Sequence, residues 1–555
     1  MNRIQQLLLE DKKALILGTL LGIASGLMSF AFLAFLNFMI GHIMAGTNTE
    51  VNPNYVLVLG GIILGFIGSR RWLSRLVIEL SQRLYWRLRM EILQLLLRAD
   101  YQQLYRKENK IHSALLYDIG ALVQASLSII EFMTSSVIVL ACLIYMASLS
   151  VSLFAITLLT ASSGILVYNI RARHHNRQFE ITRDLEDGFM KKFNDLLYGF
   201  KEVYMDRRKG TEIMDRHIRG IAKRAYDNNT KAYIGFLNNQ ITGTVLFYLL
   251  IASIMLFFSI WLEIEAATTV SFLFILLYLL SSIETIMVLL PGFARAKISL
   301  DRLTGLKSEL EGTDQVVQEV SHRMSIDEFE NIVMQDIVFA YAGKEGEQNF
   351  CIGPISLEVT KGETLFIYGG NGSGKTTLVY ALLGLLKAHS GSIHFNGRRL
   401  DAQSFADYKA LFSVVFSDFY LFDEIYGKSD FDRTAAQDYL QLFEIDDKVQ
   451  IAERGFSSID LSTGQKKRLA LISALLEERP LLVLDEWAAD QDPHFRKKFY
   501  EQIIPQINEK GVSIVAITHD DAYYHCADRL YKMEYGQLKD ESLLLQQQVL
   551  TLKAE

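Results

Sequence analysis

The chain has 555 residues, of which 50% are hydrophobic and 21% charged, and its formal net charge is −7. This length exceeds one compact domain, so we expect at least two. The acidic balance argues against a nucleic-acid partner, because nucleic-acid-binding domains are usually basic. Cys142, Cys351 and Cys526 show no spacing typical of a metal site or a disulfide, which predicts reduced, buried thiols.

Six long apolar runs dominate the first part of the chain. A helix of about 20 apolar residues crosses the ~30 Å hydrocarbon core of a bilayer. The second run is short, but its helical pattern continues to Leu80. The runs cover residues 14–44, 55–68, 129–148, 151–168, 241–262 and 268–290. We therefore predict an α-helical transmembrane domain with six spans over residues 1–310, in contact with a lipid bilayer.

The positions of lysine and arginine orient these spans. The short loops 45–54, 149–150 and 263–267 contain neither residue, whereas the long connections after the second and fourth spans are rich in both. Positive charge marks the cytoplasmic side of a membrane protein. Both termini and both long connections are thus predicted to be cytoplasmic. A soluble protein with buried helices would not explain this asymmetry. The long connections are helical in pattern, and we expect short crossing segments at their tips, near residues 101–112 and 196–207.

Polar side chains inside the spans are candidates for a substrate path. Glu284 lies within the last span, where a carboxylate should face the bundle interior or a water-filled cavity. A structural hydrogen bond to another span is the alternative. Further polar or amphipathic candidates are Asn37, Asn239, Gln240, Tyr248 and Tyr278. Pro291, followed by a glycine, is predicted to end or kink the last span.

A polar linker is predicted over residues 311–330, followed by an α/β domain over residues 331–550. Its first strong motif matches G-x-x-x-x-G-K-[ST], and it lies between an expected strand, 364–368, and an expected helix. In this motif, backbone N–H groups surround phosphates, the lysine reaches the β and γ oxygens, and the hydroxyl after it binds Mg²⁺. The motif and the threonine after it comprise Gly369, Gly370, Asn371, Gly372, Ser373, Gly374, Lys375, Thr376 and Thr377.

Three more motifs follow along the chain. The first is Leu461, Ser462, Thr463, Gly464 and Gln465, or LSTGQ. Asp485 and Glu486 then end an apolar strand, so that the first carboxylate can join a magnesium shell and the second can polarise a water molecule. Finally, His519 closes a strand over 512–518. An acidic pair or a histidine at the end of a strand is, by itself, only a weak indication of an ATPase site. Both become stronger indications when they follow a phosphate loop in the sequence.

With these motifs in order, nearly the whole chain resembles the ABC transporter family. LSTGQ is similar to the LSGGQ signature of that family, with Thr463 in place of the first glycine. The resemblance implies that Tyr341 stacks on adenine and that Glu486 is the catalytic carboxylate. It also implies that Asp490 and Asp492 belong to the D-loop, and that His519 contacts the γ-phosphate. Six spans before one ATPase domain look like a half-transporter of the exporter type.

The resemblance also implies a partner. In the family, ATP on one phosphate loop is capped by the signature segment of a second subunit. Because the sequence carries one motif set, a C2 homodimer is the simplest expectation, and a heterodimer stays open. We expect ATP and Mg²⁺ as cofactors. The spans should lie in the bacterial inner membrane, with the ATPase domain in the cytoplasm.

One family residue is missing. The stretch FSVVFSDFYLF, residues 412–422, places Ser417 where the family has a glutamine that touches Mg²⁺ or the attacking water. A serine hydroxyl can serve as such a ligand with a shorter reach, and Asp418 can add a carboxylate through water. The alternative is that Ser417 only caps the turn.

FSVVFSDFYLF, LSTGQKKRLAL and LDEWAADQDP together resemble a branch of the family that exports cyclic or constrained peptides. It includes exporters of lipopeptide toxins such as syringomycin, of the pyoverdine siderophore precursor and of lasso-peptide microcins. The sequence thus predicts a homodimeric ATP-driven exporter of a peptide-like small molecule, working by alternating access. Alternatives are a lipid or drug flippase, a siderophore importer on the same fold, and a regulator that does not pump. The hydrolytic residues Lys375, Asp485, Glu486 and His519 argue against the last.

Overall fold

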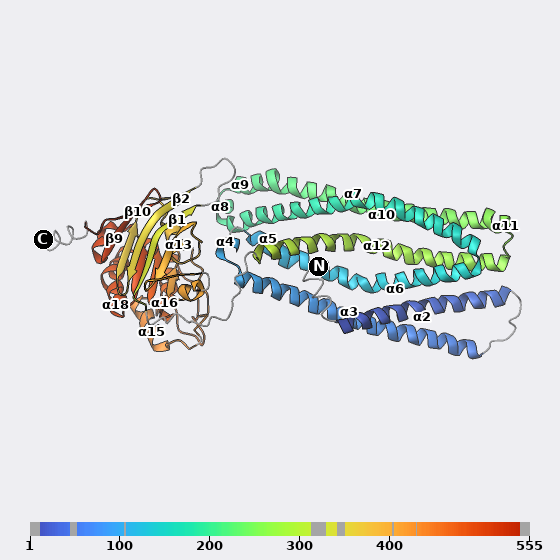
Figure 1. Cartoon of the computed structure of the whole chain (residues 1–555), viewed down its shortest axis with the longest axis horizontal. Helices are drawn as coiled ribbons and strands as arrows, with labels where there is room; N and C mark the ends of the chain where they lie inside the picture. Colours follow the sequence, from blue (N-terminus) through green and yellow to red (C-terminus); the bar gives the residue numbers. More distant parts are fainter. Residues whose placement is uncertain are drawn as a thin grey trace. The chain divides into compact units, whose positions relative to one another are not determined.

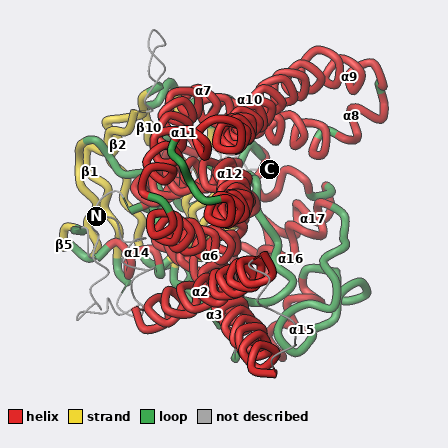
Figure 2. The backbone as a smooth tube through the Cα atoms, turned by 90° about the vertical axis from the view of Figure 1, so that its right-hand side faces the viewer, coloured by secondary structure: helices red, strands yellow, loops and turns green. Residues whose placement is uncertain are grey.

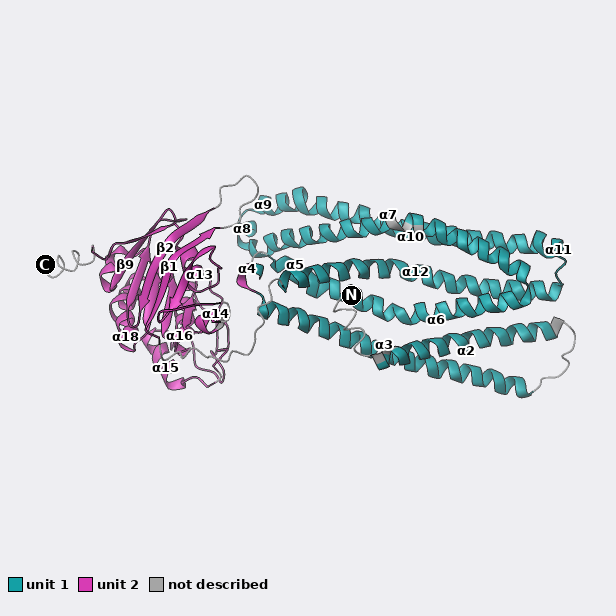
Figure 3. Cartoon of the chain, in the orientation of Figure 1, with its two compact units in different colours: residues 1–99, 103–312 teal, residues 100–102, 313–555 magenta. Residues whose placement is uncertain are grey.

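The computed structural model describes residues 12–44, 53–104, 107–311, 329–340, 350–401, 404–428 and 430–543. The chain divides into two compact units (Figure 3). Unit 1 comprises residues 1–99 and 103–312, and unit 2 comprises residues 100–102 and 313–555. Most of the predicted linker, and Tyr341, lie outside the described residues.

Unit 1 is a bundle of long helices. Within the described residues, six helical segments are long and apolar enough to cross a membrane, which confirms the six predicted spans. The main helices are α2 (Lys12–Met44), α3 (Pro53–Arg98), α6 (Ile119–Leu149), α7 (Val151–Tyr198), α10 (Arg219–Ser253) and α12 (Ala266–Leu310). In Figures 1 and 2, α6 and α12 lie between the pair α2/α3 and the pair α7/α10. The short helix α11 (Ser259–Trp261) follows α10 after a π-helical turn.

Several of these helices are much longer than a bilayer is thick. The 48 residues of α7 span roughly 70 Å at 1.5 Å per residue, more than twice the ~30 Å hydrocarbon core. Short helices stand at both predicted tips. They are α4 (Tyr101–Leu104) and α5 (Glu108–Ser113) at the first, and α8 (Phe200–Met205) and α9 (Arg207–Glu212) at the second. The helical pattern of the long connections therefore predicted their structure correctly.

Pro291 does not end the last span. Helix α12 continues through it to Leu310, so this part of the prediction is wrong. A proline inside a helix costs about 3 kcal/mol. Leu303, Leu306 and Leu310 are buried beyond it, in a cluster with side chains of α3 and α5. Burying a leucine contributes roughly 1.5–3 kcal/mol, so these three residues offset the cost of the proline.

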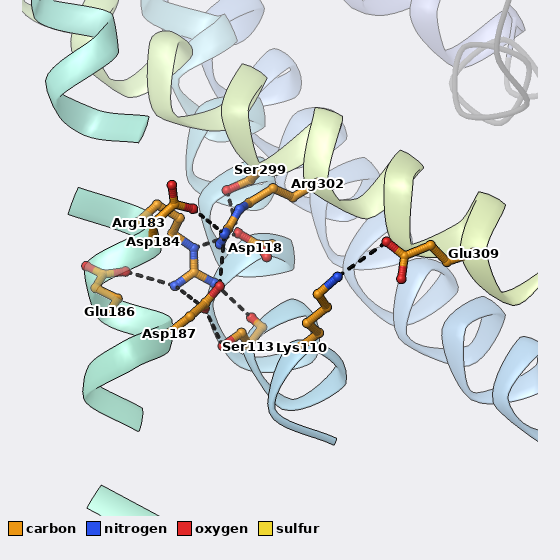
Figure 4. Close-up of polar contacts among 10 residues, drawn as sticks. All are labelled: Lys110, Ser113, Asp118, Arg183, Asp184, Glu186, Asp187, Ser299, Arg302 and Glu309. Carbon is orange, nitrogen blue, oxygen red and sulfur yellow. Dashed lines mark hydrogen bonds and ion pairs between the residues drawn. The ribbon is translucent and has the colours of Figure 1, made fainter. Parts of the chain in front are cut away.

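A polar cluster with a buried centre joins α7 and α12 to the segment that leads into α6 (Figure 4). Arg183 donates from Nε to Asp118 Oδ1 at 3.1 Å, and both side chains are buried. The Ser299 hydroxyl donates to the same oxygen at 2.9 Å. Arg302 makes ion pairs with Asp184 at 2.8 Å and with Asp187 at 2.9 Å. We call Ser113, Asp118, Arg183, Asp184, Glu186, Asp187, Ser299 and Arg302 the Arg183 cluster.

The described residues of unit 2 form two sheets. The first is antiparallel, in the order β2-β1-β4-β5, and the second has the order β10-β9-β3-β8-β7-β6. The strands are β1 (Asn331–Ala340), β2 (Cys351–Thr360), β3 (Thr364–Tyr368), β4 (Ser390–Phe395), β5 (Arg398–Arg399), β6 (Phe412–Val415), β7 (Leu481–Asp485), β8 (Ser513–Ile517), β9 (Arg529–Glu534) and β10 (Gln537–Asp540). The helices are α13 (Lys375–Leu382), α14 (Phe405–Lys409), α15 (Arg433–Leu442), α16 (Thr463–Leu476), α17 (Pro493–Lys498) and α18 (Ile504–Glu509).

The four parallel strands of the second sheet are buried on both faces. In β3, Phe366 packs into one hydrophobic cluster, while Leu365 and Ile367 pack into the other. Strands β3, β8, β7 and β6 are parallel neighbours. Their carboxyl ends thus meet at one edge, where ligands bind in open α/β sheets.

The cysteines depart from the expectation in one respect. All three are free thiols, and Cys142 is buried, but Cys526 is only half-buried and Cys351 is exposed. It begins β2, a strand in which exposed and buried side chains largely alternate. The first position falls on the solvent side.

Candidate active site

Four predicted segments come together at the carboxyl edge of the second sheet. The phosphate loop follows β3, the pair Asp485 and Glu486 closes β7, His519 follows β8, and Ser417 follows β6. Residues more than 100 positions apart in the sequence therefore share one edge.

The phosphate loop needs its glycines for two separate reasons. Gly369 and Gly374 have positive φ values, 153° and 110°. A Cβ on Gly374 would also lie 2.7 Å from Ile352 Cγ2, and one on Gly369 would overlap the carbonyl oxygen of Met533. By contrast, a Cβ on Gly370 or Gly372 would meet open space. The loop is thus packed on one side and open on the other.

The side chain of Lys375 folds back onto the backbone of this loop. Its side chain is buried, and Nζ donates to the carbonyl oxygens of Gly369 at 2.9 Å and Gly370 at 3.1 Å. It is also the first residue of α13, whose amino end favours anions through its free N–H groups and dipole. An ammonium and a helix amino end in one open loop are the groups that bind a phosphate chain.

Glu486 lies beside the loop in an unusual backbone conformation. Its φ is +51°, in the left-handed region, and its N–H donates to the Ile517 carbonyl at 3.1 Å. Its Oε1 lies 3.2 Å from His519 Nε2 and 3.9 Å from Lys375 Nζ. The carboxylate is thus placed to accept a proton from water, with an imidazole in reach to orient it.

The loop that carries His519 is anchored by a tyrosine. The Tyr500 hydroxyl lies 2.6 Å from Thr518 Oγ1 and donates to Asp520 Oδ2 at 2.9 Å. Arg496 forms an ion pair with Asp520 at 3.2 Å. The residues on either side of His519 are therefore held, while its own ring stays half-exposed.

Asp485 and Ser417 form a second polar pair. The Ser417 hydroxyl donates to Asp485 Oδ2 at 3.1 Å. Asp485 is only 1% exposed, and its Oδ1 has no hydrogen-bond partner among the residues that the structure describes. Burial raises the pKa of Asp485, and the bond from Ser417 partly offsets this. A buried carboxylate oxygen without a partner, next to a hydroxyl, fits the oxygen ligands of Mg²⁺. The Ser417 hydroxyl is thus directed at the expected metal ligand, which favours the ligand role over turn capping.

Ser417→Ala tests that role. If the hydroxyl stabilises the Mg²⁺ or water shell, its loss removes a bond to a charged group worth about 1.5–3 kcal/mol. We expect kcat for ATP hydrolysis to fall about ten- to hundredfold. Ser413→Ala is a matched control, because Ser413 also donates to a carboxylate, Glu477, but at the opposite end of β6. Unchanged kcat and unchanged magnesium dependence in Ser417→Ala would leave turn capping. Asp418→Asn would then show whether the Asp418 carboxylate contributes to the Mg²⁺ or water shell in place of Ser417.

The LSTGQ segment forms the start of α16. Ser462 is the N-cap: its Oγ accepts from the Gln465 N–H, and Gln465 Oε1 accepts from the Ser462 N–H. Thr463 is exposed, so a side chain is accommodated where the family has glycine. At Gly464 a Cβ would lie 2.8 Å from the Asp490 carbonyl oxygen. The second glycine of the signature is therefore the one that the packing requires.

The predicted D-loop packs against this segment. Asp492 caps α17 by accepting from the Phe495 N–H at 2.9 Å, and it pairs with Arg468 at 2.8 Å. Gln491 donates to the Gly464 carbonyl at 3.1 Å. Asp490 pairs with Lys467 at 2.7 Å. The sequence prediction missed Lys467, although its position continues the buried stripe of α16 through Leu471 and Ala474.

The candidate path residues are spread over unit 1. A cavity of about 460 Å³ lies among α6, α7, α10 and α12, and its lining is mostly apolar. Of the six candidates, only Asn239 is among its described lining residues. Asn37 donates to the Tyr145 hydroxyl at 3.1 Å, and Glu284 accepts from the Thr244 hydroxyl at 2.7 Å. Gln240 and Tyr278 are half-buried, and Tyr248 is exposed.

Comparison with known proteins agrees with this geometry. Residues 352–489 match the family model described as ABC transporter. Over 470 residues the chain is 30% identical to the ATP-binding protein SyrD of Pseudomonas syringae pv. syringae, covering 82% of each chain. The chain belongs to the ABC transporter family.

Two further matches differ in how much of the transporter they cover. It is 26% identical over 219 residues to the energy-coupling factor transporter ATP-binding protein EcfA1 of Staphylococcus aureus strain MRSA252, covering 38% of the transporter and 80% of EcfA1. A bacterial Atm1-family ABC exporter with ATP bound has the same fold, with a TM-score of 0.77 at 16% identity, covering 96% of the transporter and 95% of that chain. The transporter is thus an integral membrane protein with the exporter fold that couples ATP hydrolysis to transport.

Proposed function

We propose that the transporter exports a cyclic or otherwise constrained peptide, or a siderophore precursor, from the bacterial cytoplasm across the inner membrane. The observation that carries this proposal is the similarity to SyrD over 82% of both chains, together with the exporter fold. The three motif stretches that resemble the peptide-exporting branch lie in the same chain. The apolar lining of the cavity near Asn239 favours a lipid or drug as a second candidate substrate.

The residues at the sheet edge divide the work of hydrolysis. Lys375 and the phosphate loop bind the β and γ phosphates of ATP, and Glu486 polarises the attacking water while His519 orients it. Thr376, Asp485 and Ser417 hold Mg²⁺. The ion, when bound, neutralises charge that develops on the phosphates. Asp485 Oδ1 is buried and has no hydrogen-bond partner within the described part of the chain, which supports this set of ligands.

A homodimer completes each site. In this proposal Ser462 and the exposed Thr463 of one subunit contact the ATP on the phosphate loop of the other. Both residues lie at the amino end of α16, a 14-residue helix whose dipole favours a phosphate group. Alternating access then follows from closure and opening of the two ATPase domains.

A substrate panel tests the proposal. The purified transporter in nanodiscs would be assayed for ATPase stimulation by cyclic peptides, linear peptides of equal composition, siderophore precursors and lipids. Uptake of a stimulating compound into inverted vesicles then measures direction. We expect the cyclic peptides or siderophore precursors to stimulate and to accumulate inside. Stimulation by lipids alone would support the second candidate, and ATP-driven loss from the vesicles would indicate an importer.

Glu284→Gln asks whether this carboxylate belongs to the path. The amide oxygen can still accept from the Thr244 hydroxyl, so the bond between α10 and α12 survives while the charge is lost. We expect basal ATPase activity to persist and the order of stimulating compounds to change. Glu265→Gln, at the exposed start of the same helix, is the matched control. Identical stimulation profiles in Glu284→Gln and the unmodified transporter would assign Glu284 a structural role.

A further inference from the structure

A buried lysine connects α16 to the loop that carries Glu486. Lys467 is 4% exposed, and its Nζ donates to the Glu486 carbonyl oxygen at 2.9 Å. The same ammonium pairs with Asp490 at 2.7 Å. In return, the Trp487 indole Nε1 donates to the Lys467 carbonyl oxygen at 2.8 Å. Two hydrogen bonds in opposite directions therefore join Lys467 to the Glu486 carbonyl and to the Trp487 side chain.

These contacts are well buried on one side. Trp487 is 1% exposed and packs against the rings of Phe443, Phe495 and Phe499. A buried ammonium is costly unless it is paired and hydrogen-bonded, and Lys467 is both. Its geometry is accordingly constrained by three groups from one short segment, residues 486–490.

The position of Glu486 depends on this restraint. A left-handed φ in a residue other than glycine costs of order 1–3 kcal/mol and persists only where the surroundings hold it. The Ile517 carbonyl holds the N–H of Glu486, and Lys467 holds its carbonyl oxygen. From this backbone position the Glu486 carboxylate lies 3.2 Å from His519 Nε2.

We propose that Lys467 is a positioning residue for ATP hydrolysis, which fixes the Glu486 backbone so that the carboxylate reaches the attacking water. This inference rests on the proposed role of Glu486. It assigns a task to a side chain that acts through the Glu486 backbone. It also makes one lysine the link between the helix of the LSTGQ segment and the carboxylate of the same chain.

Lys467→Met is the main test, because methionine keeps an unbranched apolar side chain and removes the ammonium. A displacement of about 1 Å at a reacting group can cost about a hundredfold in rate. We expect kcat to fall at least tenfold, with unchanged KM for ATP, unchanged binding of a fluorescent ATP analogue and an unchanged thermal midpoint. Lys467→Arg should recover part of kcat, since a guanidinium can donate to both the carbonyl and Asp490. Asp490→Asn, at a half-exposed side chain, should give a smaller loss because the bond to Glu486 remains.

Lys498→Met is the matched control. Lys498 is also a largely buried lysine, paired with Glu444 at 2.6 Å, and it lies on α17. We expect kcat of Lys498→Met to equal that of the unmodified transporter. The inference is overturned if Lys467→Met keeps kcat, or if kcat and nucleotide binding fall together without recovery in Lys467→Arg. Glu486→Gln separates the two proposals: if that variant hydrolyses ATP normally, the role of Glu486 itself is wrong, whatever Lys467 does.

Discussion

Glu486→Gln is expected to abolish turnover while ATP still binds. The amide cannot take a proton from water, and general-base catalysis contributes about 10²–10⁴-fold. Phosphate release by the purified transporter should fall by at least a hundredfold. Binding of the fluorescent ATP analogue should persist, because the phosphate loop and Lys375 are unchanged. The variant should also accumulate as a closed, ATP-bound dimer, detectable by cross-linking between subunits.

Glu478→Gln is the control for this experiment. It changes a carboxylate in the same unit that is 68% exposed and paired with Lys428, and we expect its turnover to match the unmodified transporter. Normal hydrolysis in Glu486→Gln would remove Glu486 from the proposed mechanism. Loss of nucleotide binding in that variant would instead point to a structural role at the end of β7.

Asp118→Ala is expected to destabilise unit 1 strongly. Arg183 lies about 48 Å along α7 from Val151, beyond the reach of a ~30 Å hydrocarbon core, so the pair belongs to the extension outside the bilayer. Removing Asp118 deprives the buried guanidinium and the Ser299 hydroxyl of their shared acceptor. Breaking a buried pair costs about 3–5 kcal/mol when a charge is left uncompensated. Arg183 keeps its ion pair with the half-exposed Glu186 at 2.8 Å, so we expect a loss near the lower end of that range. The thermal unfolding midpoint in detergent should fall clearly.

Two further variants make this result specific. Asp215→Ala removes an exposed i,i+4 pair with Arg219, which is worth about 0–1 kcal/mol, and should leave the midpoint nearly unchanged. The double variant Asp118→Leu with Arg183→Leu removes both charges, and replacing a buried pair by apolar side chains is often neutral. It should therefore unfold at a higher temperature than Asp118→Ala. Equal midpoints in all variants would show that the cluster contributes little to stability.

The residues that the sequence proposes for hydrolysis meet at one edge of the second sheet, because the order of the strands brings them together. An apolar strand before Gly369, another before Asp485 and a third before His519 are parallel neighbours, so their following residues had to meet. Lys467 escaped prediction because a lysine in the run Lys466-Lys467-Arg468 resembles a solvated charge. Only the packing of α16 against residues 486–490 reveals its partners.

The sequence predicted where the membrane helices lie in the chain, but not which side of each helix is buried. Asn239 and Tyr248 both lie on α10, yet the first is buried and the second is 57% exposed. Hydropathy gives the length of a span, whereas the side that a residue presents depends on its neighbours. Pro291 is a second example of a feature that the sequence alone does not determine. Helix α12 continues past it because leucines further along are buried in the folded structure.

The length of α7 has a mechanical consequence. A stiff rod of roughly 70 Å that tilts by about 5° about one end moves its other end by roughly 6 Å. The Arg183 cluster connects α7 by hydrogen bonds and ion pairs to α12 and to the segment that leads into α6. These contacts restrain α7 from bending independently of its neighbours. A rotation of that size at the end next to α8 therefore reaches the other end of α7 as a displacement somewhat larger than the ~4.6 Å diameter of the helix backbone.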